Sequence, residues 1–99
     1  MNEEFNKKIM KDFGLEGMDS REQERMIEKI GNLLFESVVE RSVDVMDEEM
    51  MNEFDVVIGN AGSDYQQIIS FLKSKVLGFD NIVIEEMSRL KRATSGIFA

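Results

Sequence analysis

The amino-acid sequence predicts an all-α protein, a compact bundle of about five helices with a long central second helix. Three observations predict this fold. The 99 residues contain no proline and a single tyrosine, and this composition favours helices over strands. Apolar residues recur every three or four positions, which is the period of a helix face. The apolar segments are also bounded by residues typical of helix ends, so the local signals agree with one another.

The length of the chain indicates one domain. A chain of 99 residues can bury one modest core but is too short for two. We therefore expect a single helical domain over residues 1–99, in which residues 93–99 form a flexible tail.

The first helix is expected to begin at residue 2 or 3 and to end at residue 13. Gly14 should end it in a Schellman motif, in which Leu15 folds back on Met10. The apolar side chains of this helix recur every four residues and are Phe5, Ile9 and Phe13.

The second helix is predicted to be the longest, over about residues 20–45. Asp19 is a suitable N-cap, and Glu22 three residues later resembles the second half of a capping box. Gly31 lies in the middle of this helix, where we expect it to allow the close approach of a neighbouring helix. The main apolar stripe consists of Met26, Ile27, Ile30, Leu33, Leu34 and Val38.

The second half of this helix is apolar on another side as well. The residues concerned are Phe35, Val39, Val43 and Met46. A helix that is apolar on more than one side is covered on more than one side. This half is therefore either the buried spine of the bundle or a seam between two copies of the chain. The spine is the default, because a domain this small needs one element around which the others pack.

The third helix is predicted to begin after Asp47, which is a suitable N-cap for it. Its inward apolar face continues until Gly59. The stretch over residues 59–63 contains two glycines and is the only clear loop of any size. Two glycines ahead of a helix are also the raw geometry of an anion-binding turn, but the lysine of a phosphate-binding loop is missing.

The last two helices are separated by a glycine. The fourth helix should begin with Ser63 as its cap and run to about Leu77, where Gly78 ends it. Asp80 should cap the fifth helix, which is expected to fray after Arg92.

The charged residues are distributed unevenly. The chain has 20 acidic and 12 basic residues, and its net charge of -8 repels phosphate backbones and anionic lipid at long range. Most of the acids lie in residues 1–64, whereas residues 65–99 are mildly basic. The simplest interpretation is a solvated helix face with cations at helix C-termini. The alternative is a docking site for an acidic partner, such as the acidic half of a second copy.

No segment predicts an association with membranes. The longest uninterrupted apolar runs have three residues, as in Val56-Val57-Ile58, and are too short to span a bilayer. The N-terminus lacks the basic start and apolar run of a signal peptide. The absence of cysteine fits a reducing compartment. We therefore expect a cytoplasmic protein.

The residue types present restrict the chemistry of the chain. Without histidine or cysteine there is no nucleophile system of the Ser-His-Asp or Cys-His type, and no imidazole or thiolate ligand for a metal. The acidic clusters near Asp47 and Asp80 lack the alternating ligands and central glycine of a calcium loop. We therefore expect no catalytic residue, no metal and no cofactor. An enzyme that uses carboxylates alone remains an unfavoured alternative.

A nucleic-acid function is a second alternative. The third and fourth helices have the order of a helix-turn-helix, but the second of them begins Asp64-Tyr65-Gln66-Gln67, without an arginine. The acidic surface also opposes DNA binding, although it would suit a mimic of nucleic acid that occupies a nucleic-acid-binding protein.

The favoured function is a non-enzymatic protein–protein interaction module whose partner is another protein or a second copy of the chain. The tail carries an Ile-Phe pair beyond a glycine, and such a pair either tucks into its own domain or is offered to another chain. The candidate interaction residues are Phe35, Val39, Val43, Met46, Ile97 and Phe98.

The order of several motifs adds a resemblance to a known family. The motifs are Phe13-Gly14-Leu15, Met18-Asp19-Ser20-Arg21-Glu22-Gln23-Glu24, Ile27-Glu28-Lys29-Ile30-Gly31, Met46-Asp47-Glu48-Glu49, and Phe79-Asp80-Asn81-Ile82 ahead of Glu85-Glu86. In this order they resemble a family of short helical proteins of unknown function from candidate-phylum bacteria with reduced genomes. The likeness covers roughly residues 13–92 and rests on helix caps and stripe positions. It implies a small helical bundle and no activity, cofactor or functional residue.

Overall fold

The computed structural model of the chain describes residues 2–62 and 64–94, and the side chains from Asn6 onward. This part of the chain contains five helices and no strand, which confirms the all-α prediction. The helices are α1 (Asn2–Asp12), α2 (Ser20–Asp44), α3 (Glu48–Ala61), α4 (Tyr65–Lys75) and α5 (Phe79–Ala93). Helix α2 has 25 residues and is the long central helix that the sequence predicts.

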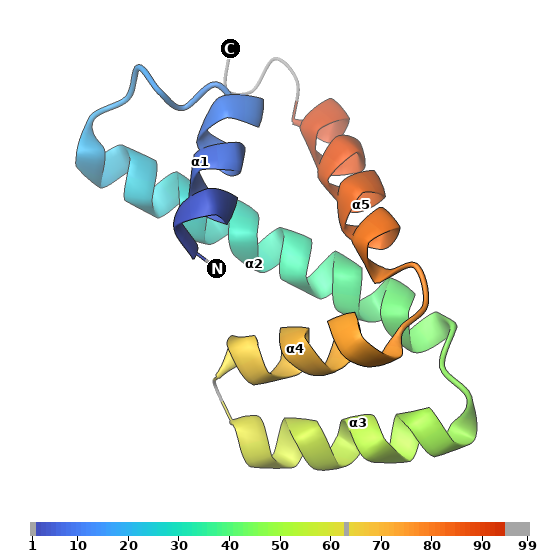
Figure 1. Ribbon diagram of the computed structural model, residues 1–99. Helices are drawn as coiled ribbons and strands as arrows, with labels where there is room; N and C mark the ends of the chain where they lie inside the picture. Colours follow the sequence, from blue (N-terminus) through green and yellow to red (C-terminus); the bar gives the residue numbers. More distant parts are fainter. Residues whose placement is uncertain (1, 63, 95–99) are drawn as a thin grey trace.

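The helices are arranged around α2 (Figure 1). Helix α1 crosses the first half of α2, and α5 packs beside α2. Helices α3 and α4 form an antiparallel pair near the second half of α2, where Phe35 of α2 stacks on Tyr65 of α4. All five helices contribute to one core, which includes Ile9, Leu15, Ile30, Leu34, Val38, Phe54, Ile68, Leu72, Phe79, Ile82 and Met87.

Two of the predicted helix caps are present. The carboxylate of Asp19 accepts a hydrogen bond from the backbone N–H of Glu22 at 2.9 Å, and Asp47 accepts one from the N–H of Met50 at 2.8 Å. These bonds satisfy N–H groups that have no partner within the first turn of a helix.

The predicted Schellman ending of α1 is also present. Gly14 has a positive φ of 68°, and the N–H of Leu15 donates to the carbonyl of Met10 at 2.9 Å. The side chain of Gln23 fixes the connection that follows, because its amide donates to the carbonyls of Leu15 at 3.1 Å and Glu16 at 3.3 Å.

Several local predictions are wrong. Helix α3 continues past Gly59 to Ala61, because a glycine near a helix end is tolerated, and Gly62 takes the positive φ instead. Helix α4 is capped by Asp64, which accepts a hydrogen bond from the N–H of Gln66 at 3.1 Å. Ser63, the predicted cap, lies outside the described residues.

The start of α5 also differs from the prediction. The N-cap is Gly78, and Asp80 lies inside the first turn, where its charge still faces the positive end of the helix.

The expectation for Gly31 in α2 is also wrong. A Cβ atom at this position would meet no atom within 4 Å. The expected close approach of a neighbouring helix is therefore absent.

The second apolar side of α2 is used within the chain. Phe35 stacks on Tyr65 at the start of α4, with ring centroids 4.5 Å apart. Val39, Val43 and Met46 are partly buried and pack against the core. In the described part of the chain, this side of α2 therefore meets other helices of the same molecule.

Candidate functional site

The connection between α4 and α5 is a tight turn over residues 76–78. At its start the N–H of Val76 donates to the carbonyl of Leu72 at 2.8 Å, and at its end the N–H of Phe79 donates to the carbonyl of Val76 at 3.3 Å. Gly78 has a φ of 77°, in the left-handed region that favours glycine. The chain therefore changes direction between the two helices within three residues.

This turn exposes a leucine almost completely. Leu77 is 97% exposed, whereas Val76 and Phe79 on either side of it are only 5% and 7% exposed. The two buried side chains anchor the turn in the core. Because they are fixed, the backbone holds Leu77 in a defined position, pointing away from the protein.

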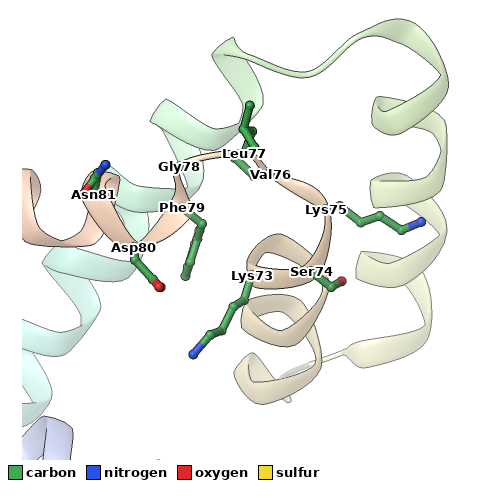
Figure 2. Close-up of a pocket in the computed structure, with 9 residues that line it drawn as sticks. All are labelled: Lys73, Ser74, Lys75, Val76, Leu77, Gly78, Phe79, Asp80 and Asn81. Atoms are coloured by element: carbon green, nitrogen blue, oxygen red, sulfur yellow. The ribbon is translucent and has the colours of Figure 1, made fainter.

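A depression of about 390 Å³ lies beside Leu77. Figure 2 shows that the ring of Phe79 lies between the ends of α4 and α5, and that Lys73 and Asp80 extend on the same side of it. Lys73 and Asp80 are exposed, and neither forms an ion pair with another described residue. The lining residues are Lys73, Ser74, Lys75, Val76, Leu77, Gly78, Phe79, Asp80 and Asn81.

The groups around this depression carry charges of both signs. Its lining includes a single carboxylate, that of Asp80, together with the amines of Lys73 and Lys75. The amine of Lys75 points toward α3, where it lies 4.0 Å from a carboxylate oxygen of Glu53. An apolar side chain flanked by charges of both signs can bind a protein surface of matching shape and charge.

A second depression, of about 380 Å³, lies between α3 and α4. Its lining is polar and apolar but uncharged and consists of Val57, Asn60, Gln66, Gln67, Ser70 and Phe71. Over the described residues, no group of three or more acidic side chains is placed to hold a metal ion. No described helix has the length and hydrophobicity required to cross a membrane.

An ion-pair cluster joins α5 to α2. One nitrogen of Arg41, Nη1, lies 2.8 Å from Oε1 of Glu85 and 3.1 Å from Oε2 of Glu86. Glu86 is only 4% exposed, and Arg89 lies 3.7 Å from the same oxygen. The hydrogen bonds to Glu85 and then to Glu86 raise the pKa of Arg41 above its ordinary value, because both carboxylates stabilise the charged guanidinium. The cluster fixes α5 against α2 and so contributes to positioning the turn that precedes α5.

A buried hydroxyl lies next to Arg41 in the sequence. Ser42 is fully buried on α2, and its Oγ has no hydrogen-bond partner among the described residues. A serine within a helix can turn its hydroxyl toward the carbonyl one turn earlier, but this hydroxyl does not.

The structure places the predicted interaction residues in two groups. Phe35, Val39, Val43 and Met46 are partly buried and pack against the core, so much of their apolar surface is already covered by the chain itself. Ile97 and Phe98 lie outside the described residues. Contact of these residues with a partner stays a prediction.

Sequence reasoning did not single out Leu77. It follows Val76 and precedes Phe79 by two residues, so it resembles one more apolar residue at the end of the fourth helix. Only the early end of α4 at Lys75 turns Leu77 outward while its neighbours stay buried. No local pattern distinguishes these orientations. The basic residues beside it, Lys73 and Lys75, are part of the basic C-terminal third noted above.

Comparison with known proteins adds a family. Residues 9–94, which run from within α1 to the residue after α5, match the family described as "Protein of unknown function (DUF5663)". The match includes residues 13–92, the stretch that carries the resemblance described above. No curated protein and no solved structure matches the chain. The chain therefore belongs to the DUF5663 family of proteins of unknown function.

Proposed function

We propose that this chain is a non-enzymatic protein–protein interaction module that contacts its partner through the turn between α4 and α5. The observation that supports this proposal is the 97% exposure of Leu77 between two buried anchors. Single exposed apolar residues are common on protein surfaces and need no explanation by themselves. Leu77 differs from them because it lines a depression in a turn that the core holds in place, and because two charged residues of that depression, Lys73 and Asp80, have no ion-pair partner among the described residues.

The energetics favour a binding role for Leu77. Complete burial of a leucine side chain is worth about 1.5–3 kcal/mol. Leu77 makes almost none of this contribution to folding, because it is exposed in the folded protein as well. A side chain held on an ordered turn also loses less freedom on binding than one on a flexible segment. Most of the free energy of burying Leu77 is therefore available for binding a partner.

The charges near the turn favour a protein over nucleic acid as the partner. Lys73 and Lys75 supply positive charge, but the carboxylates of Asp80 and Glu53 lie close to the same surface. Nucleic acid requires several cations that together neutralise phosphates. The mixed charges at the turn therefore favour a protein partner.

We also propose, from the sequence, that the protein is cytoplasmic and that it comes from a candidate-phylum bacterium.

An affinity experiment tests the proposed function. The tagged chain, its Leu77→Asp variant and an Ile84→Asp variant are incubated with lysate of the native host, and bound proteins are identified by mass spectrometry. Ile84 is a matched control, because it is an apolar residue of α5 that is 58% exposed and lies outside the depression. We expect the Leu77 substitution to remove a bound protein that the Ile84 variant retains. Equal capture by all three chains would contradict the proposal.

A further inference from the structure

We propose that the outward side of α3 is a docking surface for a cationic amphipathic helix of a partner protein. The surface is formed by Glu48, Met51, Asp55 and Ile58, which we call the α3 row. It lies on a different helix from Leu77 and its turn, so this inference does not rest on the proposed function.

The α3 row is one exposed face of a helix. Its four residues follow one another at intervals of three, four and three, which places their side chains in line over about 15 Å. All four are exposed, and the apolar members Met51 and Ile58 are 38% and 43% exposed. Helix α3 packs inward through a neighbouring row, which consists of Met50, Phe54, Val57 and Ala61.

Helix α3 has a free side because it lies at the edge of the molecule. It packs mainly against α4, where the rings of Phe54 and Phe71 stack with centroids 5.8 Å apart. Figure 1 shows α4 on one side of α3 and no other described helix on the opposite side. A helix with one main neighbour is covered on one side, so a partner can reach the α3 row.

The charges of this region are all negative. Between Arg41 and Lys73 the chain carries seven acidic residues and no lysine or arginine. Within the α3 row, the carboxylates of Glu48 and Asp55 alternate with the two apolar side chains, and neither forms an ion pair with a described residue. The complement of this row is a surface on which cations alternate with apolar groups.

Helix stability explains only part of this acidity. Asp47 caps α3 and Glu48 lies in its first turn, where a negative charge is favourable. Asp55 lies in the middle of α3 and gains nothing from the helix dipole. Asp44, four residues before the row, is the last residue of α2, where the dipole makes a negative charge unfavourable. The charges of Asp44 and Asp55 therefore benefit a cationic partner more than the fold.

Other occupants suit the α3 row less well. Its carboxylates repel nucleic acid and anionic membranes. A divalent cation needs several converging oxygen ligands, and the described residues include no group of three or more acids placed to hold one. A helix is favoured over an extended segment because its side chains recur at the same intervals. Each lysine or arginine can then face an acid, and each leucine can face Met51 or Ile58.

Synthetic helical peptides test the chemistry of the occupant. The first peptide has lysine and leucine alternately at intervals of three and four, with alanine and glutamine elsewhere. The second has glutamate in place of lysine, and the third has glutamine in place of leucine. We expect the whole chain to bind the lysine–leucine peptide with a dissociation constant between about 10 µM and about 300 µM, and the others at least tenfold more weakly. Fluorescence anisotropy measures the binding. Equal affinity for the lysine and glutamate peptides, or no binding of the lysine–leucine peptide, would overturn the proposal.

Variants of the chain test which residues make the contact. Met51→Gln combined with Ile58→Gln removes the apolar part of the α3 row and should weaken binding of the lysine–leucine peptide at least tenfold. Glu48→Gln combined with Asp55→Asn should weaken it about three- to tenfold at an ionic strength of about 0.05 M. At about 0.5 M this second effect should be much smaller, because salt screens the attraction.

Each double variant has a matched control. Glu24→Gln combined with Glu28→Gln changes the net charge by the same amount at two exposed positions of α2. Ile84→Gln removes an apolar residue of α5 that is 58% exposed. Neither control should change the affinity by more than about twofold. Circular dichroism should be unchanged throughout, because every substituted residue is exposed. Controls that bind as weakly as the α3 variants would show attraction by net charge alone and would overturn the proposal.

The position of the bound peptide separates this surface from the turn that carries Leu77. In NMR spectra of the whole chain, the largest amide shifts on adding the lysine–leucine peptide should lie in α3. Leu77→Asp should leave the affinity for this peptide unchanged. Largest shifts in residues 73–81, or weaker binding by the Leu77 variant, would contradict docking on α3. The function proposed for the turn is tested by capture from lysate, so either proposal can fail without the other.

Discussion

Arg41 is the residue on which the buried charge of Glu86 depends. Glu86 is 4% exposed, whereas the side chain of Arg41 is 35% exposed, so the pair lies at the edge of the core between α2 and α5. Removing the arginine leaves a buried carboxylate with only the more distant Arg89 beside it. We expect Arg41→Met to lower Tm by roughly 5–10 °C.

A double variant serves as the control for this prediction. Arg41→Met combined with Glu86→Leu removes both charges and should recover most of the lost Tm, because a buried pair can be replaced by apolar residues of similar size. Thermal unfolding followed by circular dichroism measures both. A double variant less stable than Arg41→Met alone would contradict this account of the cluster.

The raised pKa of Arg41 determines how this stabilisation depends on pH. A base whose pKa rises on folding stabilises the native state at every pH below its ordinary value, and the stabilisation is lost only as the pH rises through the raised pKa. For an arginine both values lie far above neutral pH. The difference in Tm between the wild type and Arg41→Met should therefore be the same at about pH 7 and about pH 10.

The hydroxyl of Ser42 forms no hydrogen bond with the described residues. The side chain is fully buried. Burial of an unsatisfied hydroxyl costs about 1–3 kcal/mol, so we expect Ser42→Ala to raise the free energy of unfolding by about 1 kcal/mol. Ser88→Ala on α5 is the matched control, because it has the same change in helix propensity at an exposed site. Urea denaturation should show a larger gain at Ser42 than at Ser88.

At the scale of the helices, two glycines distinguish the effect of backbone conformation on stability from the effect of packing. Gly31 lies inside α2, and a Cβ atom there would have open space around it, so nothing in the fold requires a glycine at this position. We expect Gly31→Ala to stabilise the protein by about 0.5–1 kcal/mol, through higher helix propensity and a less flexible unfolded chain.

Gly78 is the matched control for this substitution. Its surroundings are equally open, but its φ is +77°. Gly78→Ala should therefore destabilise the protein by about 1–2 kcal/mol, because the left-handed region is unfavourable for a residue with a Cβ. Urea denaturation of the two variants measures whether each substitution raises or lowers the free energy of unfolding. A stabilising effect at both positions would show that the turn is free to adopt another conformation.

Helix α5 starts earlier than its capping residue predicts. Asp80 is a good N-cap residue, yet the helix begins two residues before the site that such a cap would select. Gly78 and the buried Phe79 account for the earlier start, because the left-handed glycine reverses the chain and the aromatic ring enters the core at once. The expected cap thus becomes a charge in the first helical turn.

The whole molecule is somewhat elongated. Its radius of gyration is 14.6 Å, compared with about 13 Å for a typical domain of 100 residues, and its extents are 45 × 24 × 18 Å. The pair α3–α4 lies near one half of α2, while α1 crosses the other half (Figure 1). Contacts along α2 therefore have to join the two ends into one folding unit.

Phe35 is one of these contacts, and its role can be tested on the purified chain. It stacks on Tyr65 and packs against the core, although it is only partly buried. We expect Phe35→Ala to lower the free energy of unfolding by about 2 kcal/mol. Hydrogen exchange should show faster exchange in α3 and α4 as well as in α2. An unchanged stability would mean that Phe35 serves mainly a partner.

Local interactions explain why much of the fold could be predicted from the sequence. A helix face repeats every three or four residues, and a cap bonds to an amide two or three residues away, so both leave a short-range pattern. The five helices, the caps Asp19 and Asp47 and the ending at Gly14 follow from such patterns. Errors arose at the starts of the last two helices: the adjacent Asp64 and not Ser63 caps α4, and Gly78, two residues before Asp80, caps α5.

The tertiary structure alone decided which apolar and charged residues meet. It placed Arg41 beside Glu86, a residue 45 positions later, and covered Phe35 with Tyr65. It also buried Val76 and Phe79 while leaving Leu77 outside. These outcomes depend on how whole helices pack against one another, and packing joins residues far apart in the chain. A pattern of period three or four determines that a residue lies on a helix face, but only the neighbouring helices determine whether that face is covered.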